Sequence, residues 1–229
     1  MSPAGPAART GARRTGGRVS ARVRILHGMM SLNDHRSVQE HTVDELARIA
    51  EVAKGSVYYH FGSKDKLVRE MLVHGAAELQ NIMEQARTAE SGDEDLTAGA
   101  APAQARFRAQ LHAAFQFLGE HPSFTGLVAF ALAQRQGDES HQLRTEKEAI
   151  VGLLADQLHQ LEASETAEAA EPMPRDCLTP HATLEIAATA LLSAAVTLSI
   201  ERLTVHPEWN TEDCVDALLR MVTTARNGP

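Results

Sequence analysis

The sequence has few of the residues that mark β-rich, disulfide-linked or secreted proteins. Only 4% of its 229 residues are aromatic, and its two cysteines, Cys177 and Cys214, stand alone without a CxxC pair. Isolated cysteines give no reason to expect a disulfide and are typical of a reduced compartment. The N-terminus also lacks the apolar stretch of a secretion signal, so we expect a cytoplasmic protein. Strand signals are scarce beside abundant Ala and Leu, which predicts an all-α fold.

Catalytic, metal and membrane patterns are missing as well. There is no HExxH pair, no phosphate-binding loop and no Ser, His and Asp order with a turn signal. Cys177 and His181 are four residues apart, but Pro180 lies between them and the spacing matches no zinc site. We therefore expect no enzyme activity, no cofactor and no bound metal. The uncharged run from Ile186 to Ile200 is too short and too rich in Thr and Ser to span a bilayer.

Charge is present in quantity and is distributed unevenly. Residues 1–69 hold twelve Lys and Arg against six Asp and Glu, a net charge of +6, so the whole-chain charge of −8 leaves −14 for the remainder. A basic head on an acidic body is the layout of a protein that touches DNA with one end. Residues 1–18 are basic and poor in apolar side chains, so we expect a disordered arm. That arm either follows DNA phosphates or is an unstructured terminus, and both interpretations stay open.

The stretch Thr42 to Lys64 predicts two short helices joined by a tight turn. Thr42 followed three residues later by Glu45 forms a capping box for the first helix. The second helix runs from Ala53 or Lys54 to about His60 and ends at Phe61-Gly62. Ser63 can cap the helix after it. This arrangement indicates a helix-turn-helix over residues 42–61, whose second helix enters the major groove of DNA.

The side chains of this stretch suit DNA. Lys54 and Lys64 offer cations to phosphates, hydroxyl and imidazole groups offer hydrogen bonds, and Gly55 lets the backbone come close. The alternative is that Tyr58 and Phe61 only fill a small core, which we favour for Phe61 and leave open for one tyrosine. The candidate DNA-contacting residues are Thr42, Lys54, Gly55, Ser56, Tyr58, Tyr59, His60 and Lys64.

Residues 19–79 resemble the DNA-binding domain of the TetR (tetracycline-repressor-like) family of bacterial transcription factors. The matching positions are Ile25-Leu26, Thr42-Val43, Leu46-Ala47, Ala50, Val52, the run from Lys54 to Phe61, and Ser63-Lys64. The resemblance covers the first third of the chain. It departs at Glu51, where the family usually has Gly, and at Ala53, where it usually has Ser or Thr. Loss of that cap would cost about 1 kcal/mol of helix stability.

Helical periodicity continues through the remainder, which we assign to a ligand-binding and dimerisation domain over residues 80–229. Ser123 and Thr211 are expected to cap two of its helices. The helices expected outside the helix-turn-helix span residues 19–33, 64–88, 103–120, 123–132, 139–161, 183–206 and 211–226. In the family that it resembles, the helix from residue 64 joins the two domains and carries the ligand's signal, so the resemblance implies that role here.

Five of the six phenylalanines fall between residues 107 and 130. An apolar cavity lined by aromatic rings could bind a small effector there, although ordinary core packing is the favoured explanation for any single ring. The candidate effector-binding residues are Phe107, Phe115, Phe117, Phe124 and Phe130.

The expected function is a ligand-responsive transcriptional repressor. The resemblance implies a homodimer through helices 183–206 and 211–226 that binds a palindromic operator in double-stranded DNA and is released by a small molecule. Two other classes stay open, a small all-α enzyme and a protein-interaction regulator that has lost operator binding. Activation in place of repression also stays open.

Overall fold

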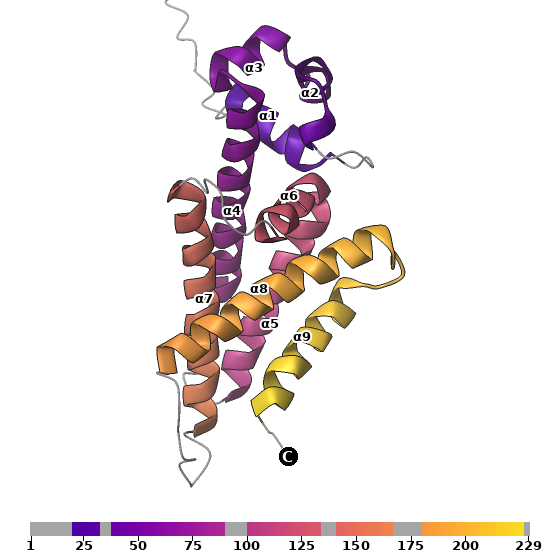
Figure 1. Ribbon diagram of the computed structural model, residues 1–229. Coiled ribbons are helices and arrows are strands. Elements are labelled where there is room, and N and C mark those ends of the chain that lie inside the picture. Colours follow the sequence, from indigo (N-terminus) through magenta and orange to yellow (C-terminus); the bar gives the residue numbers. More distant parts are fainter. Residues whose placement is uncertain (1–19, 33–37, 90–99, 134–140, 167–179, 227–229) are drawn as a thin grey trace, which may run out of the picture.

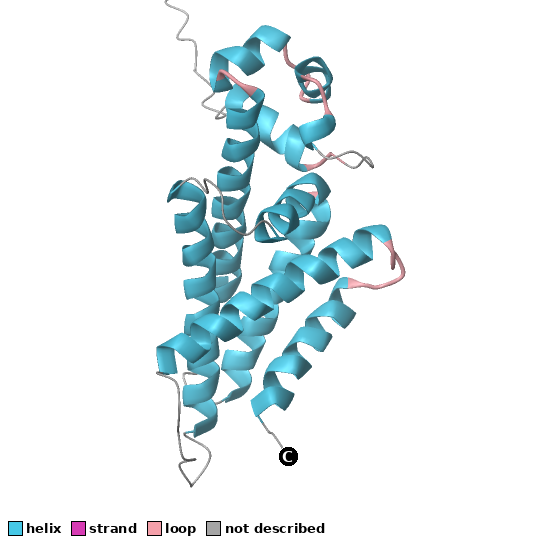
Figure 2. Ribbon diagram, viewed as in Figure 1, coloured by secondary structure: helices cyan, strands magenta, loops and turns pink. Residues whose placement is uncertain are grey.

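The computed structural model describes residues 20–32, 38–89, 100–133, 141–166 and 180–226, and every regular element within these ranges is a helix (Figures 1 and 2). The expected all-α fold is thereby confirmed. The arm at residues 1–18 and Cys177 lie outside the described residues. The helices are α1 (Ala21–Met30), the 3₁₀ turn η1 (Val38–Glu40), α2 (Val43–Ile49), α3 (Lys54–Phe61), α4 (Lys64–Ala89), α5 (Ala100–Glu120), α6 (Pro122–Ala133), α7 (His141–Thr166), α8 (Pro180–Thr204) and α9 (Thr211–Arg226).

Side-chain caps fix the starts of the helices in the N-terminal region. The capping box at α2 is complete, since the Glu45 amide donates to the Thr42 hydroxyl at 3.2 Å and the Thr42 amide donates to the Glu45 carboxylate at 2.7 Å. Ser63 caps α4 by accepting from the Lys66 amide at 3.2 Å. Both caps were predicted, because a cap is a local pattern of residue types at fixed spacing.

Two predicted caps in the C-terminal region are wrong. Ser123 lies inside α6, which begins at Pro122, and its hydroxyl donates to the Leu32 carbonyl at 2.8 Å. Proline suits the first position of a helix because its fixed φ is helical. The N–H that it lacks would have no partner within the helix at that position. At α9 the cap is Asn210, which accepts from the Asp213 amide at 2.8 Å. The Thr211 hydroxyl accepts instead from Arg202 at 2.6 Å.

The start of α8 also differs from expectation. The helix expected from residue 183 begins three residues earlier, at Pro180. Proline breaks a helix in its interior and is well accepted in the first turn, so its position decides its effect.

The helices divide into a small head and a larger body joined by α4. Helices α1 to α3 lie together at one end of the molecule, and α4 runs from them deep into the body (Figure 1). Its 26 residues correspond to roughly 39 Å. In the body α4 packs against α5 and α7, while α8 and α9 lie along the outside. The predicted domain boundary at residues 79–80 falls within α4.

One glycine sets how closely the body packs on α4. A Cβ atom added at Gly75 would overlap the ring of Phe124, which is fully buried. The absence of a side chain at Gly75 therefore allows α6 to bring Phe124 directly against the backbone of α4. The Phe124 ring also makes an edge-to-face contact with Phe117, with ring centroids 5.7 Å apart.

Helix α8 is apolar over a longer stretch than its uncharged run from Ile186 to Ile200. The stretch Thr183–Thr204 has a mean hydropathy of 1.7 and is long enough to cross a membrane, whereas the shorter run is not. Length and composition alone are weak evidence, because a core helix of a globular protein has the same properties. Here 39% of the most apolar 18 residues of this stretch are buried inside the molecule, and Ala188 and Val196 pack in the core.

Candidate nucleic-acid interface

The turn between α2 and α3 requires an unusual backbone conformation at Glu51. This residue has a φ of 53°, in the left-handed region that favours glycine. After it, the Val52 amide donates to the Ala47 carbonyl at 2.9 Å, which closes the turn. The sequence resemblance marked this position as one where glycine is usual, and the conformation explains that preference.

Helix α3 has one buried face and one exposed face. Val57 and Phe61 are buried in the head, and the Arg22 guanidinium lies 5.6 Å from the centroid of the Phe61 ring. Tyr58 and Tyr59 lie on the exposed side, with 47% and 85% of their surface accessible. The question left open by the sequence is therefore answered for each ring. Phe61 is a core residue, and neither tyrosine is buried.

The N-terminus of α3 presents a cation and an open backbone. Lys54 Nζ lies 2.7 Å from Asp44 Oδ2, and this hydrogen bond with its ionic attraction raises the pKa of Lys54. At Gly55 an added Cβ would meet nothing within 4 Å in the described chain. The fold therefore does not need glycine here, and alanine would be the better helix former by about 1 kcal/mol. Ala53 precedes the helix without a side-chain cap, as predicted.

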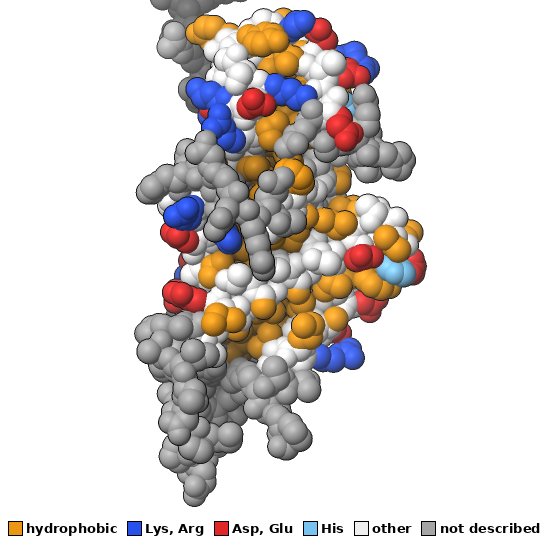
Figure 3. Space-filling model, viewed as in Figure 1, with side chains coloured by type: hydrophobic (Ala, Val, Ile, Leu, Met, Phe, Trp, Pro, Cys, Tyr) orange, Lys and Arg blue, Asp and Glu red, His pale blue; other side chains and the backbone are white. Residues whose placement is uncertain are grey.

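The other candidate residues border the same surface. Thr42 is exposed, although its hydroxyl is used in the capping box of α2. Ser56, His60 and Lys64 are half-buried, and the His60 ring packs edge-on against Tyr59 at a centroid distance of 5.2 Å. The helix-turn-helix therefore brings the eight candidates to one end of the molecule, where Figure 3 shows basic and acidic side chains interspersed.

A second feature lies in the body, where a cavity of about 60 Å³ opens beside α4. Its lining is apolar except for Lys147, and three of the residues that form it come from α4 itself. The lining residues are Leu72, Ala76, Leu79, Leu118, Phe124, Val128, Ala131, Leu132, Lys147, Ile150, Leu192 and Val196.

The five candidate phenylalanines are not gathered around this cavity. Only Phe124 lines it. Phe107 and Phe115 are fully buried core residues, Phe117 is buried against His121 and Phe124, and Phe130 is 50% exposed. The lining was not predicted because it consists mostly of aliphatic residues from five helices. Such residues have no distinctive spacing in the sequence.

A cluster of His27, His74 and Glu78 was also missed. His74 and Glu78 are four residues apart on α4, a spacing that places both on one helical face, but His27 belongs to α1. Burial lowers the pKa of His74, partly offset by the negative charge of Glu78. Nothing in the sequence indicates that α1 would bring a second imidazole to this pair.

The head matches a known family. Residues 25–71 match the family model described as bacterial regulatory proteins of the tetR family. This range includes the helix-turn-helix and the first turns of α4. None of the curated proteins matches the chain.

Solved structures resemble most of the chain, including both head and body. A TetR-like transcriptional regulator from Rhodococcus sp. RHA1 is 18% identical with a TM-score of 0.61, and the match covers 93% of this chain and 98% of that one. The regulator FadR from Bacillus subtilis, in complex with stearoyl-CoA, is 13% identical with a TM-score of 0.63 over 88% and 97% of the chains.

A third similar structure is the FadR repressor from Thermus thermophilus in complex with lauroyl-CoA. It is 18% identical with a TM-score of 0.54, and the match covers 88% of this chain and 93% of that one. At these identities the likeness extends to the fold of head and body together.

Proposed function

We propose that the chain, whose residues 25–71 match the family model of the bacterial tetR regulatory proteins, is a repressor that binds a palindromic operator as a homodimer and is released by an apolar effector. The observation that carries this proposal is the exposed face of α3. Two tyrosines, a lysine and an open glycine backbone stand on a helix whose opposite face is anchored in the core.

On DNA, we assign two roles to the residues of this surface. Lys54, Tyr58, Tyr59, His60, Lys64 and Thr42 mainly contact phosphates, which fix the position of the head. Gly55 and Ser56 are close enough to the N-terminus of α3 to reach base edges in the major groove. The Asp44 carboxylate that pairs with Lys54 is exchanged for a phosphate on binding.

Gly55 allows a sharp test of this interface, because the fold leaves room for a side chain there. Gly55→Ala is expected to raise stability by about 1 kcal/mol through helix propensity and to weaken operator binding. Unchanged operator affinity in Gly55→Ala would contradict a close approach of the α3 backbone to DNA.

Lys64→Ala is expected to weaken binding to all sequences alike and to lower by about one the slope of binding affinity against salt concentration.

The dimer is proposed to form through α8 and α9. Figure 3 shows hydrophobic side chains gathered over these two helices, and Ile186 and Met221 are each more than half exposed. Two copies of the pair would make a four-helix bundle and place two α3 helices about 34–36 Å apart, in successive major grooves.

Sedimentation of two variants tests this interface. Met221→Glu should give monomers because it buries a charge in the bundle. Phe130→Glu is the control, as it adds the same charge at an exposed apolar residue of α6. Dimers that survive the first substitution, or dissociate equally in both variants, would place the interface elsewhere.

The effector is proposed to occupy the cavity beside α4. Its apolar lining suits a hydrocarbon chain, and two proteins of the same fold are described in complex with stearoyl-CoA and lauroyl-CoA. We therefore propose a long-chain acyl compound, whose entry would have to widen this cavity of about 60 Å³. Because Leu72, Ala76 and Leu79 belong to α4, a bound chain would press on the helix that carries the head. Ligand and DNA would then weaken each other's binding by the same factor.

Two adjacent alanines provide a matched test. Ala76 lines the cavity and its neighbour Ala77 does not. Release of a labelled operator by lauroyl-CoA and stearoyl-CoA would be measured by fluorescence anisotropy, with CoA alone as the control for the head group. Ala76→Leu should raise the concentration needed for release, and Ala77→Leu should not. Release by CoA alone, or equal effects of both substitutions, would contradict an acyl chain in this cavity.

A further inference from the structure

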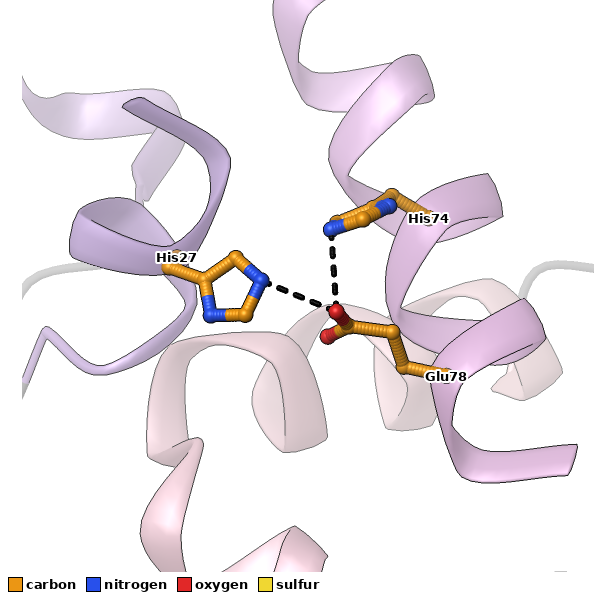
Figure 4. A group of neighbouring side chains, drawn as sticks. All are labelled: His27, His74 and Glu78. Carbon is orange, nitrogen blue, oxygen red and sulfur yellow. Dashed lines mark hydrogen bonds and ion pairs between the residues drawn. The ribbon is translucent and has the colours of Figure 1, made fainter. Parts of the chain in front are cut away.

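Two histidines and one glutamate meet where the head joins α4. His27 comes from α1, while His74 and Glu78 stand one turn apart on α4 (Figure 4). Both imidazole rings point toward the same carboxylate. The three side chains are between 24% and 45% exposed, so the cluster is sheltered but reachable from solvent.

The three donor atoms are spaced as ligands of one small cation are. His27 Nε2 lies 2.9 Å from Glu78 Oε1, His74 Nε2 lies 3.2 Å from the same oxygen, and the group's three donor atoms all lie within 4.8 Å of one another. Zinc binds imidazole nitrogen and carboxylate oxygen at about 2.0–2.2 Å, which in a tetrahedron separates the ligand atoms by roughly 3.3 Å. Small side-chain rotations would bring all three atoms to these positions.

The described residues leave one ring nitrogen of His74 without a hydrogen bond. That atom, Nε2, is buried and has no hydrogen-bond partner among the described residues, although it lies 3.2 Å from Glu78 Oε1. That oxygen is already shared with His27 at hydrogen-bond distance. A buried polar atom without a partner is costly and often marks an unseen ligand.

We propose that His27, His74 and Glu78 form a binding site for a divalent transition cation, with zinc the best match to two imidazoles and one carboxylate. Three protein ligands leave one position of a tetrahedral ion open for water. The mixed nitrogen and oxygen donors also suit Ni²⁺, Co²⁺ and Cu²⁺, whereas Mg²⁺ and Ca²⁺ prefer oxygen ligands alone.

A cation bound at this site would affect regulation by the protein. This effect rests on the proposed function. The ion would tie α1 of the head to α4. The segment after α1 is also held to the body, because the Ser123 hydroxyl of α6 donates a hydrogen bond to the Leu32 carbonyl. It would thereby hold the head at one angle to α4 and change operator affinity. By linkage the operator would change cation affinity by the same factor.

Metal binding is tested first and without DNA. Tag-free protein, stripped with a chelator and desalted, would be titrated with Zn²⁺ against a coloured chelator and with Co²⁺ by visible absorption. We expect one equivalent per protomer and d–d bands of low-symmetry Co²⁺. Glu78→Gln and His74→Gln should each weaken binding at least about tenfold. His159→Gln, at an exposed histidine of α7, is the control and should not.

Folding is checked by thermal unfolding of every metal-free protein. Zn²⁺ should raise the melting temperature of the wild type and of His159→Gln, because it binds the folded state, and should raise that of Glu78→Gln far less. Wild-type binding no tighter than that of Glu78→Gln and His74→Gln would overturn the site. The wild-type titration decides the matter even if a variant fails to fold, since absence of a stoichiometric metal also overturns it.

Coupling to DNA is tested separately. Operator affinity that changes with Zn²⁺ in the wild type but not in Glu78→Gln supports the regulatory role, and equal affinity with and without Zn²⁺ overturns that role. Absence of any operator binding would count against the proposed function, whereas the metal titration would still decide the site.

Discussion

Head and body differ in how their residues determine structure. In the head, single residues fix the backbone: Thr42 and Ser63 cap helices, Glu51 adopts the left-handed turn, and Gly62 ends α3 with a φ of 75°. In the body, the arrangement depends on many apolar contacts, such as the fit of Phe124 against Gly75. Substitutions should therefore damage stability most in the body and DNA affinity most on the surface of the head.

The largest effect on stability is expected for Phe124→Ala. Phe124 is fully buried and touches the α4 backbone, Phe117 and the cavity. Its truncation should lower the free energy of unfolding by about 3–5 kcal/mol, measured by urea denaturation. Phe130→Ala, on the same helix but half exposed, is the control and should cost far less. Similar losses for both would mean that α6 is not held by this contact.

The next largest effect is expected on DNA affinity. Tyr59 is 85% exposed, so Tyr59→Ala should leave unfolding within about 0.5 kcal/mol of the wild type. The same change should reduce operator affinity by roughly tenfold, the value of one hydrogen bond to a charged group. Fluorescence anisotropy on labelled operator measures the affinity. If Tyr59→Ala instead lowered the free energy of unfolding and left operator affinity unchanged, Tyr59 would be a structural residue and not part of the DNA-binding surface.

A smaller effect, in the opposite direction, is expected at the turn. Glu51→Gly should stabilise the protein by about 1 kcal/mol. A left-handed conformation costs a residue other than glycine roughly 1–2 kcal/mol. Glycine avoids this cost, but part of the gain is lost because glycine makes the unfolded chain more flexible. Glu51→Ala is the control, since it removes the charge and keeps the strain. Equal stabilisation by both would show that charge, not backbone conformation, is the cause.

The sequence predicted the head in more detail than the body, for a physical reason. Caps and turns are short patterns, so the capping box at Thr42 and the limits of α3 were found from residue types, and the resemblance implied the missing cap at Ala53. Helix periodicity also predicted all the body helices. The caps expected at Ser123 and Thr211 were wrong. Helix α6 begins at Pro122 and Ser123 makes a long-range bond instead, while Asn210 caps α9, which does begin at Thr211.

The sequence does not show which distant segments of the chain come together in the fold. The cavity beside α4 combines residues from five helices, and only Phe124 of the five expected rings lines it. The cluster of His27, His74 and Glu78 likewise joins residues 51 positions apart in its longest pair. Such sites depend on how helices pack, and the periodicity of each helix gives the buried face but not the partner.

The most direct test of the regulator function is the salt dependence of binding to DNA from the upstream region of the protein's own gene. We predict that two protomers bind one duplex, and that the logarithm of the binding constant falls linearly with the logarithm of salt concentration, as phosphate contacts from Lys54, Lys64 and their symmetry mates require. A strictly monomeric protein with no salt-sensitive affinity for any such fragment would contradict operator binding by this surface.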